Sequence, residues 1–287
     1  MIYADGQAFK TAPHKRVMLF GMSGLGKTTL SNMLRDAGDW FHYSVDYRIG
    51  TRYMGEYISD NFKREAMKVP LLRELLMTDS VYITSNITFD NLAPLSTYLG
   101  KPGDVARGGL PFAEYQRRQE QHARAEVAAM LDTTRFIDRA EALYGYAHFV
   151  CDTSGSICEV VDAENPADPV MTEVSAHLLP VWIKGSEAHR AELCRRFDRA
   201  PKPMYYRPEF LLQVWGEYLA QSGLTAETAD PDAFLRFGYA RLLESRQPRY
   251  AAMARWGVTV SAEEVAQVRD VAGFEALIAT AIDRSGA

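Results

Sequence analysis

The chain has 287 residues, 47% of them hydrophobic and 24% charged, which is ordinary for a globular enzyme and long enough for a core with a sizeable insertion. The formal net charge of −5 gives no support for binding nucleic acid, and no apolar run reaches the roughly 18 residues of a membrane span or the stretch of a signal peptide. Three cysteines (Cys151, Cys158 and Cys194) without metal-type pairing predict a reduced, cytoplasmic chain, in which Cys151 and Cys158 are buried or incidental thiols rather than a ligand pair.

Near the N-terminus, the segment Gly21-Met-Ser-Gly-Leu-Gly-Lys-Thr-Thr29 fits the pattern G-x-x-x-x-G-K-[ST] of a phosphate-binding loop. Residues 16–20 before it are typical of a buried strand, and residues 28–37 after it of a helix. This setting predicts a nucleoside triphosphate site, with a chance match as the alternative. The expected nucleotide-binding residues are Gly21, Ser23, Gly24, Leu25, Gly26, Lys27, Thr28 and Thr29.

Each part of this loop has a chemical reason. Glycines let backbone N–H groups converge on phosphate oxygens, and the helix N-terminus adds partial positive charge. We expect Lys27 to place its charge at the β- and γ-phosphates and Thr28 to offer its hydroxyl to Mg²⁺. The sequence therefore predicts ATP and Mg²⁺ as the ligands.

Further along the chain, short apolar runs alternate with helical patterns. The expected strands are 40–45, 147–151, 179–183 and 256–260, while 81–84 is either a short strand or part of a helical segment. Alternation of strands and helices predicts a parallel sheet covered on both faces, a three-layer α/β/α fold of the P-loop NTPase type. Asp46, Asp152 and Lys184 follow strands, and ligands of such sheets bind beyond the carboxyl ends of the strands.

This pattern divides the chain into three regions. Residues 1–68 form the first part of the core, 69–146 a mostly helical insertion on the substrate side, and 147–287 the second part of the core with C-terminal helices. Residues 112–131 predict an amphipathic helix, and its charged run 115–126 favours a solvated face. The alternative is that this insertion covers the substrate or forms a dimer.

The region of about 184–208 has the features of a lid. Leu193-Cys-Arg-Arg-Phe-Asp-Arg199 places three arginines within five residues of an expected helix, and Pro201-Lys-Pro-Met-Tyr-Tyr-Arg-Pro208 then breaks that helix. A cationic lid that closes over the nucleotide excludes water and brings guanidinium groups to the transferring phosphoryl group. The alternative is an ordinary surface helix.

Several short segments resemble the shikimate kinase and gluconate kinase group of P-loop small-molecule kinases. Val181-Trp-Ile-Lys-Gly-Ser186 with 191–196 resembles the gluconate-kinase strand and lid helix, and Tyr206-Arg-Pro-Glu-Phe-Leu-Leu212 the segment that closes the shikimate-kinase lid. Arg246-Gln-Pro-Arg-Tyr250 is similar to the Arg-x-Pro-x-Tyr helix before the last strand, and Phe62-Lys-Arg-Glu65 to a Phe-Arg pair of the substrate domain. The resemblance covers roughly residues 15–70 and 147–270.

The resemblance implies roles for individual residues. Asp46 matches the second aspartate of the family's Asp-x-Asp motif and would bind the acceptor hydroxyl and act as its base. Arg196 would reach the nucleotide phosphates, Arg207 would hold an anionic part of the acceptor, and Gly155 stands where the family has a glycine-rich substrate loop. Arg64 is the arginine of the Phe-Arg pair.

The chain also departs from this family. Ser44 replaces the first aspartate of Asp-x-Asp, which helps to hold Mg²⁺, and Asp152 is placed to supply that charge as a strand-ending Walker B aspartate. The acceptor loop is reduced to Ser-Gly-Ser, and the helical insertion is foreign to both kinases. We therefore expect an acceptor that is neither shikimate nor gluconate.

Asp46 has a second interpretation, because a carboxylate after a strand can simply cap the next helix. The neighbouring Arg48 and Arg52 favour a polar pocket that binds an anion, whereas ion pairing among the three is the simpler explanation. His42 and His148 lie on strand patterns and are expected to be packed rather than catalytic.

Together these features predict a kinase that moves the γ-phosphate of ATP to a hydroxyl of a small, anionic metabolite, using Lys27, Asp46 and Arg196 as catalytic groups. Its expected partners are ATP and that acceptor, without nucleic acid or membrane. A P-loop ATPase switch with a protein partner and a nucleotide or nucleoside kinase are the alternatives. ATP versus GTP and the oligomeric state, including a homodimer, stay open.

Overall fold

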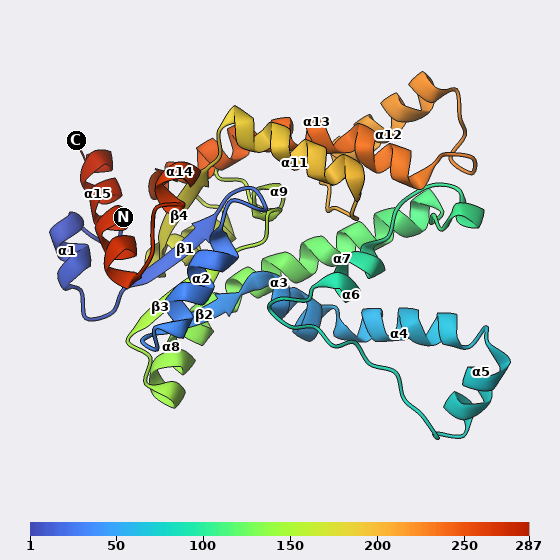
Figure 1. Ribbon diagram of the computed structural model, residues 1–287, viewed down its shortest axis with the longest axis horizontal. Helices are drawn as coiled ribbons and strands as arrows, with labels where there is room; N and C mark the ends of the chain where they lie inside the picture. The colour runs from blue at the N-terminus through green and yellow to red at the C-terminus, as the bar shows by residue number, and fades with distance from the viewer. Residues whose placement is uncertain (287) are drawn as a thin grey trace. The chain divides into compact units, whose positions relative to one another are not determined.

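A computed structural model describes residues 1–286 and contains one sheet of five parallel strands (Figure 1). The strand order is β2-β3-β1-β4-β5, so the first strand lies in the middle. The strands are β1 Arg16–Phe20, β2 Trp40–Ser44, β3 His148–Asp152, β4 Leu179–Lys184 and β5 Val258–Ser261. This confirms the predicted α/β class with a parallel sheet. Residues 81–84, in contrast, belong to neither a strand nor a helix.

Helices fill most of the remaining chain, and none within residues 1–286 is both long and apolar enough to cross a membrane. The helices are α1 Gly6–Thr11, α2 Lys27–Asp36, α3 Val45–Arg48, the π-helix η1 Ile49–Tyr53, α4 Gly55–Ala66, α5 Pro70–Met77, α6 Ala93–Leu99, the 3₁₀ helix η2 Val105–Arg107, α7 Phe112–Leu131, α8 Thr133–Tyr144, α9 Ile157–Val160, α10 Pro169–His177, α11 Glu187–Arg199, α12 Pro208–Ser222, α13 Pro231–Ala254, α14 Ala262–Val265 and α15 Val271–Gly286.

Helices cover both faces of the sheet, as the alternating side chains of β2 demonstrate. Trp40 packs edge-on against Phe274 of α15, with ring centroids 5.6 Å apart. The next side chain, Phe41, and then Tyr43 contact Phe136 of α8 instead. Because successive side chains of a strand point to opposite faces, α15 and α8 lie on opposite sides of the sheet. The arrangement is therefore three layers, α/β/α.

The chain forms two compact units. The first comprises Met1–Val45, Val127–Pro201 and the chain from Arg236 on, and it contains the whole sheet. The second comprises Asp46–Glu126 and Lys202–Leu235 and is built from helices. The candidate phosphate-binding loop lies in the first unit, whereas Asp46 begins the second.

The charged run of α7 is not the solvated face that the sequence predicts. Its buried polar side chains are Arg118, Gln119, Gln121, His122 and Glu126. Two of them hold other segments of the second unit in place: Arg118 donates to the carbonyl of Tyr98 and to Asn61, while Gln119 donates to the carbonyl of Met204 and accepts from the amide of Tyr206. The expectation is wrong because buried hydrogen-bond partners offset the cost of removing these groups from water, and those partners are remote in sequence.

Glu114 completes this polar network near the beginning of α7. Its carboxylate accepts hydrogen bonds from Arg117 at 2.7 and 2.8 Å and from Arg118 at 2.7 Å. The hydrogen bonds from Arg117 are the largest cause that lowers the pKa of Glu114, to about 2. The ionised carboxylate is therefore more stable in the folded chain than in the unfolded chain.

We predict that Glu114→Gln lowers the free energy of unfolding at pH 7 by about 1 kcal/mol, a value reduced by the solvent that screens this partly exposed group. Since the pKa is depressed on folding, the carboxylate contributes fully above its usual value of 4.5 and loses this contribution as the pH falls towards about 2. Urea unfolding at several pH values measures the effect. Glu120→Gln, at an exposed position on the same helix, is the control; equal losses in both variants would contradict the prediction.

Candidate functional site

The loop between β1 and α2 has a backbone that only glycine adopts easily. Gly21, Gly24 and Gly26 have φ values of 140°, 84° and 95°. A Cβ on Gly21 would also lie 2.6 Å from the carbonyl oxygen of Ile183 on the neighbouring strand β4. The spacing of the glycines therefore has a structural cause, and the loop turns between strand and helix with little side-chain bulk.

Lys27 is the first residue of α2, and its side chain folds back into this loop. The ammonium group donates to the carbonyls of Gly21 at 3.0 Å and Met22 at 3.1 Å, and the residue is only 6% exposed. The buried ammonium group of Lys27 is thus held by backbone carbonyls at the N-terminus of α2. Both features favour an anion at this position.

Next to Lys27, the hydroxyl of Thr28 donates a 2.7 Å hydrogen bond to Oδ2 of Asp152. Asp152 ends β3, and its backbone lies beside Leu19 in the parallel register of β1 and β3. The sequence assigns both residues to a metal, and the structure brings them together. A hydroxyl and a carboxylate are oxygen ligands of the kind that Mg²⁺ prefers.

His42 borders the same carboxylate. Its Nε2 lies 3.7 Å from Oδ2 of Asp152, and the side chain is fully buried on β2. The strand pattern predicts a packed histidine, and its burial confirms this. The sequence does not predict that His42 lies beside Asp152, because the pairing of β2 with β3 becomes visible only in the folded chain.

The loop after Asp152 packs directly on the loop between β1 and α2. A Cβ on Gly155 would overlap with the hydroxyl of Ser23 and lie 3.2 Å from the Ser23 amide. The Gly155 carbonyl in turn accepts two hydrogen bonds from α13, one from Arg246 at 2.8 Å and one from Tyr250 at 2.6 Å. Gly155 is thus fixed against Ser23, whether or not it also touches a substrate.

A buried ion pair supports this arrangement. Nε of Arg246 donates to Oε1 of Glu159 at 2.9 Å, and both side chains are almost completely inaccessible. Burial raises the pKa of Tyr250 well above its usual value, so its hydroxyl keeps the proton that it donates to Gly155. The Arg-x-Pro-x-Tyr pattern does not reveal that Arg246 and Tyr250 hold the Gly155 carbonyl, and nothing in the sequence indicates Glu159.

The predicted lid helix α11 reaches the same loop. A Cβ on Gly24 would lie 3.0 Å from Cδ2 of Leu193, in the middle of α11. The end of the helix is attached to α13, because the Phe197 ring stacks on Tyr239 with centroids 3.7 Å apart and Arg236 donates to the Asp198 carbonyl.

Arg196 lies on α11 one turn after Leu193. Its side chain is 67% exposed, and its guanidinium donates to Glu192 at 2.9 Å. The structure therefore places Arg196 on the helix that contacts the loop, with the guanidinium in an exposed ion pair. Its predicted contact with phosphate stays a prediction.

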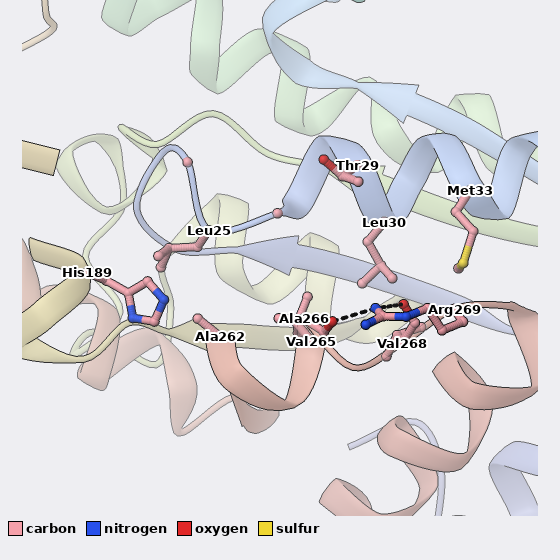
Figure 2. A pocket seen from close by; sticks show the side chains of 12 residues that line it. Leu25, Thr29, Leu30, Met33, His189, Ala262, Val265, Ala266, Val268 and Arg269 are labelled. Atoms are coloured by element: carbon pink, nitrogen blue, oxygen red, sulfur yellow. Dashed lines mark hydrogen bonds between the residues drawn. The ribbon is translucent and has the colours of Figure 1, made fainter. Parts of the chain in front are cut away.

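A cavity of about 470 Å³ lies on the other side of the loop, between α2 and α14 (Figure 2). Its lining residues are Gly24, Leu25, Gly26, Thr29, Leu30, Met33, His189, Ala262, Val265, Ala266, Val268 and Arg269. The lining is mostly apolar. Its charged or ionisable side chains are His189 of α11 and Arg269, whose guanidinium donates to the carbonyls of Ala266 and Val268. Such a space suits a flat, largely apolar group attached to whatever the loop binds.

The predicted acceptor residues belong to the second unit. Asp46 lies in the first turn of α3, Arg52 is exposed in η1, and Arg64 is exposed in the last turn of α4. Arg207 precedes α12 and lies 3.3 Å from Glu209. These residues lie on four separate elements, and their joint role in an acceptor site stays a prediction.

Comparison with known proteins adds no family: no protein-family model matches the chain, and no curated protein is significantly similar to it. The short segments that resemble shikimate and gluconate kinases thus gain no support from these comparisons.

We predict that Gly155→Ala lowers the free energy of unfolding by about 1–3 kcal/mol, because the added methyl group has no space beside Ser23. The matched control is Gly216→Ala in α12, where a Cβ would meet nothing within 4 Å. In that helix, alanine should raise the stability by up to about 1 kcal/mol. Urea unfolding of both variants tests this; an unaffected Gly155→Ala protein would show that the loop is not tightly packed.

Proposed function

We propose that this protein is an ATP-dependent kinase that transfers the γ-phosphoryl group to a hydroxyl of a small, anionic metabolite. The observation that carries the proposal is the 2.7 Å hydrogen bond between Thr28 and Asp152, at the residue that follows the buried Lys27. A cation-binding oxygen pair and a fixed cation, both at the N-terminal end of α2, match what a bound triphosphate with Mg²⁺ requires.

In this proposal, residues of the first unit bind the donor. The amides of residues 21–29 and the N-terminus of α2 hold the phosphates, and Lys27 exchanges its two carbonyl partners for phosphate oxygens. Thr28 and Asp152 would hold Mg²⁺. The hydrogen bond from Thr28 to Asp152 would weaken as the hydroxyl oxygen turns to the metal. When bound, Mg²⁺ neutralises charge on the phosphates.

The cavity beside the loop favours adenine as the base. None of its lining side chains is an aspartate, glutamate, asparagine or glutamine. Guanine exposes an N1–H and an exocyclic amino group that need acceptors, and an apolar lining leaves them unpaired. Leu30 and Val265 would cover the faces of the base, and Arg269 could stack on it.

Transfer needs an acceptor site, for which we propose Asp46 and the predicted arginines. The acceptor oxygen forms a bond to the γ-phosphorus as the bond to the β,γ-bridging oxygen breaks, and the hydroxyl proton passes to the Asp46 carboxylate. Arg196 would neutralise the moving charge, and Arg52, Arg64 and Arg207 offer cationic groups for an anionic acceptor. The resemblance to small-molecule kinases supports these roles residue by residue.

The test is ADP release by the purified protein with ATP and Mg²⁺, alone and with each member of a panel of hydroxylated, anionic metabolites. A kinase should release little ADP alone and at least about tenfold more with its acceptor. Lys27→Ala should reduce acceptor-dependent release by about 10²–10⁴-fold in a protein that still folds, because it removes the positive charge that faces the donor phosphates.

Two outcomes would count against a kinase. Appreciable ATP hydrolysis that no acceptor increases, together with an unchanged rate in Arg196→Ala, would indicate an ATPase switch. Absence of measurable ATP binding by the folded wild-type chain would remove the proposal altogether. Arg195→Ala, a neighbouring exposed arginine paired with the same glutamate, is the control for the charge of the helix.

A further inference from the structure

Large apolar side chains are exposed together at one end of the second unit. Of the fifteen large hydrophobic residues that are exposed within residues 1–286, five lie between positions 69 and 82: Val69, Leu71, Met77, Val81 and Tyr82. Leu71 is 65% exposed, Met77 72% and Tyr82 87%. Apolar groups concentrated in so short a stretch are typical of an interaction surface.

The helix within this stretch, α5, has no buried residue at all. It comprises only the eight residues Pro70–Met77, and Figure 1 shows it between α4 and the irregular segment that returns to α6. An isolated helix of this length is marginal in water, so helices of this size depend on packing of one face. One face of α5, formed by Leu72, Leu75 and Leu76, is half-buried, whereas the opposite face is exposed.

The outer face of α5 has a pattern that complements itself. Pro70, Arg73, Glu74 and Met77 are exposed and follow the spacing i, i+3, i+4, i+7, so they form one stripe along the helix. If two copies of α5 meet antiparallel about a two-fold axis at the helix centre, Arg73 of each copy faces Glu74 of the other. The same operation places Met77 over Pro70. Within residues 1–286, neither Arg73 nor Glu74 forms an ion pair.

We propose that the stripe of α5 is the surface through which two copies of this chain associate. A two-fold contact is isologous, so one patch must satisfy itself, and this stripe does so with two opposite-charge pairs between apolar ends. Residues 63–79 carry charges of both signs, Lys63, Arg64, Lys68 and Arg73 against Glu65, Glu74 and Asp79, so this stretch does not have the single-sign charge that would favour a nucleic acid or an anionic membrane. Val69 and Leu71, next to the stripe in the chain, are exposed as well and add to its apolar surface.

The experiment is sedimentation velocity of the full chain from about 1 to 100 µM, because a contact between two eight-residue helices is small and small contacts are weak. The wild type should pass from monomer to dimer over this range. Arg73→Glu and Glu74→Arg should each weaken association at least about tenfold, because each places like charges opposite one another. The double charge swap, Arg73→Glu with Glu74→Arg, should restore it.

Arg124→Glu, at an exposed position on α7, is the matched control for the change in net charge and should associate like the wild type. Circular dichroism checks that each variant is folded. A wild type that stays monomeric at all concentrations overturns the proposal, and so do single reversals without effect or a double swap that does not recover. ATP binding is measured separately, so the outcome is independent of the proposed kinase activity.

Discussion

The hydrogen bond from Thr28 to Asp152 is the interaction on which the candidate site depends. It joins the helix that follows β1 to the end of β3, and it forms because the two strands are parallel neighbours with Leu19 beside Asp152. The same register brings the loop after Asp152 against Ser23. A parallel sheet thus brings polar groups from two separate strand ends together at its carboxyl edge.

Helix α13 contacts both loops that meet at this edge of the sheet. Its residues Arg246 and Tyr250 hold the carbonyl of Gly155, and Gln247 contacts the sulfur of Met22 in the loop between β1 and α2. Two or three turns earlier, Arg236 and Tyr239 hold the end of α11. One continuous helix therefore positions both the loop and the predicted lid, which is an economical way to keep their spacing constant.

The sequence predicts those features that local chemistry determines. The glycine spacing predicts the turn at residues 21–26, and apolar runs predict five strands to within two residues at each end. Asp152 and Thr28 were predictable because each is the expected residue at the end of its own element. Their contact requires only the parallel pairing that the alternation of strands and helices already indicates.

Features that depend on distant partners were not predictable. The sequence places Arg118 and Gln119 in a charged run that predicts a solvated face. In the folded chain they are buried and form hydrogen bonds with Tyr98, Asn61 and Met204. The Arg246–Glu159 ion pair joins residues 87 positions apart. Residues 81–84 have the β-branched and aromatic composition of a strand, yet no neighbouring strand pairs with them, and propensity alone does not form one.

The most direct test of the central claim is a crystal structure with a non-hydrolysable ATP analogue and Mn²⁺ in place of Mg²⁺, with anomalous scattering to locate the metal. The proposal predicts an anomalous peak within coordination distance of Thr28 Oγ1, Asp152 beside it, and the β- and γ-phosphates at Lys27. A metal peak remote from Thr28, or a nucleotide bound away from residues 21–29, would contradict it.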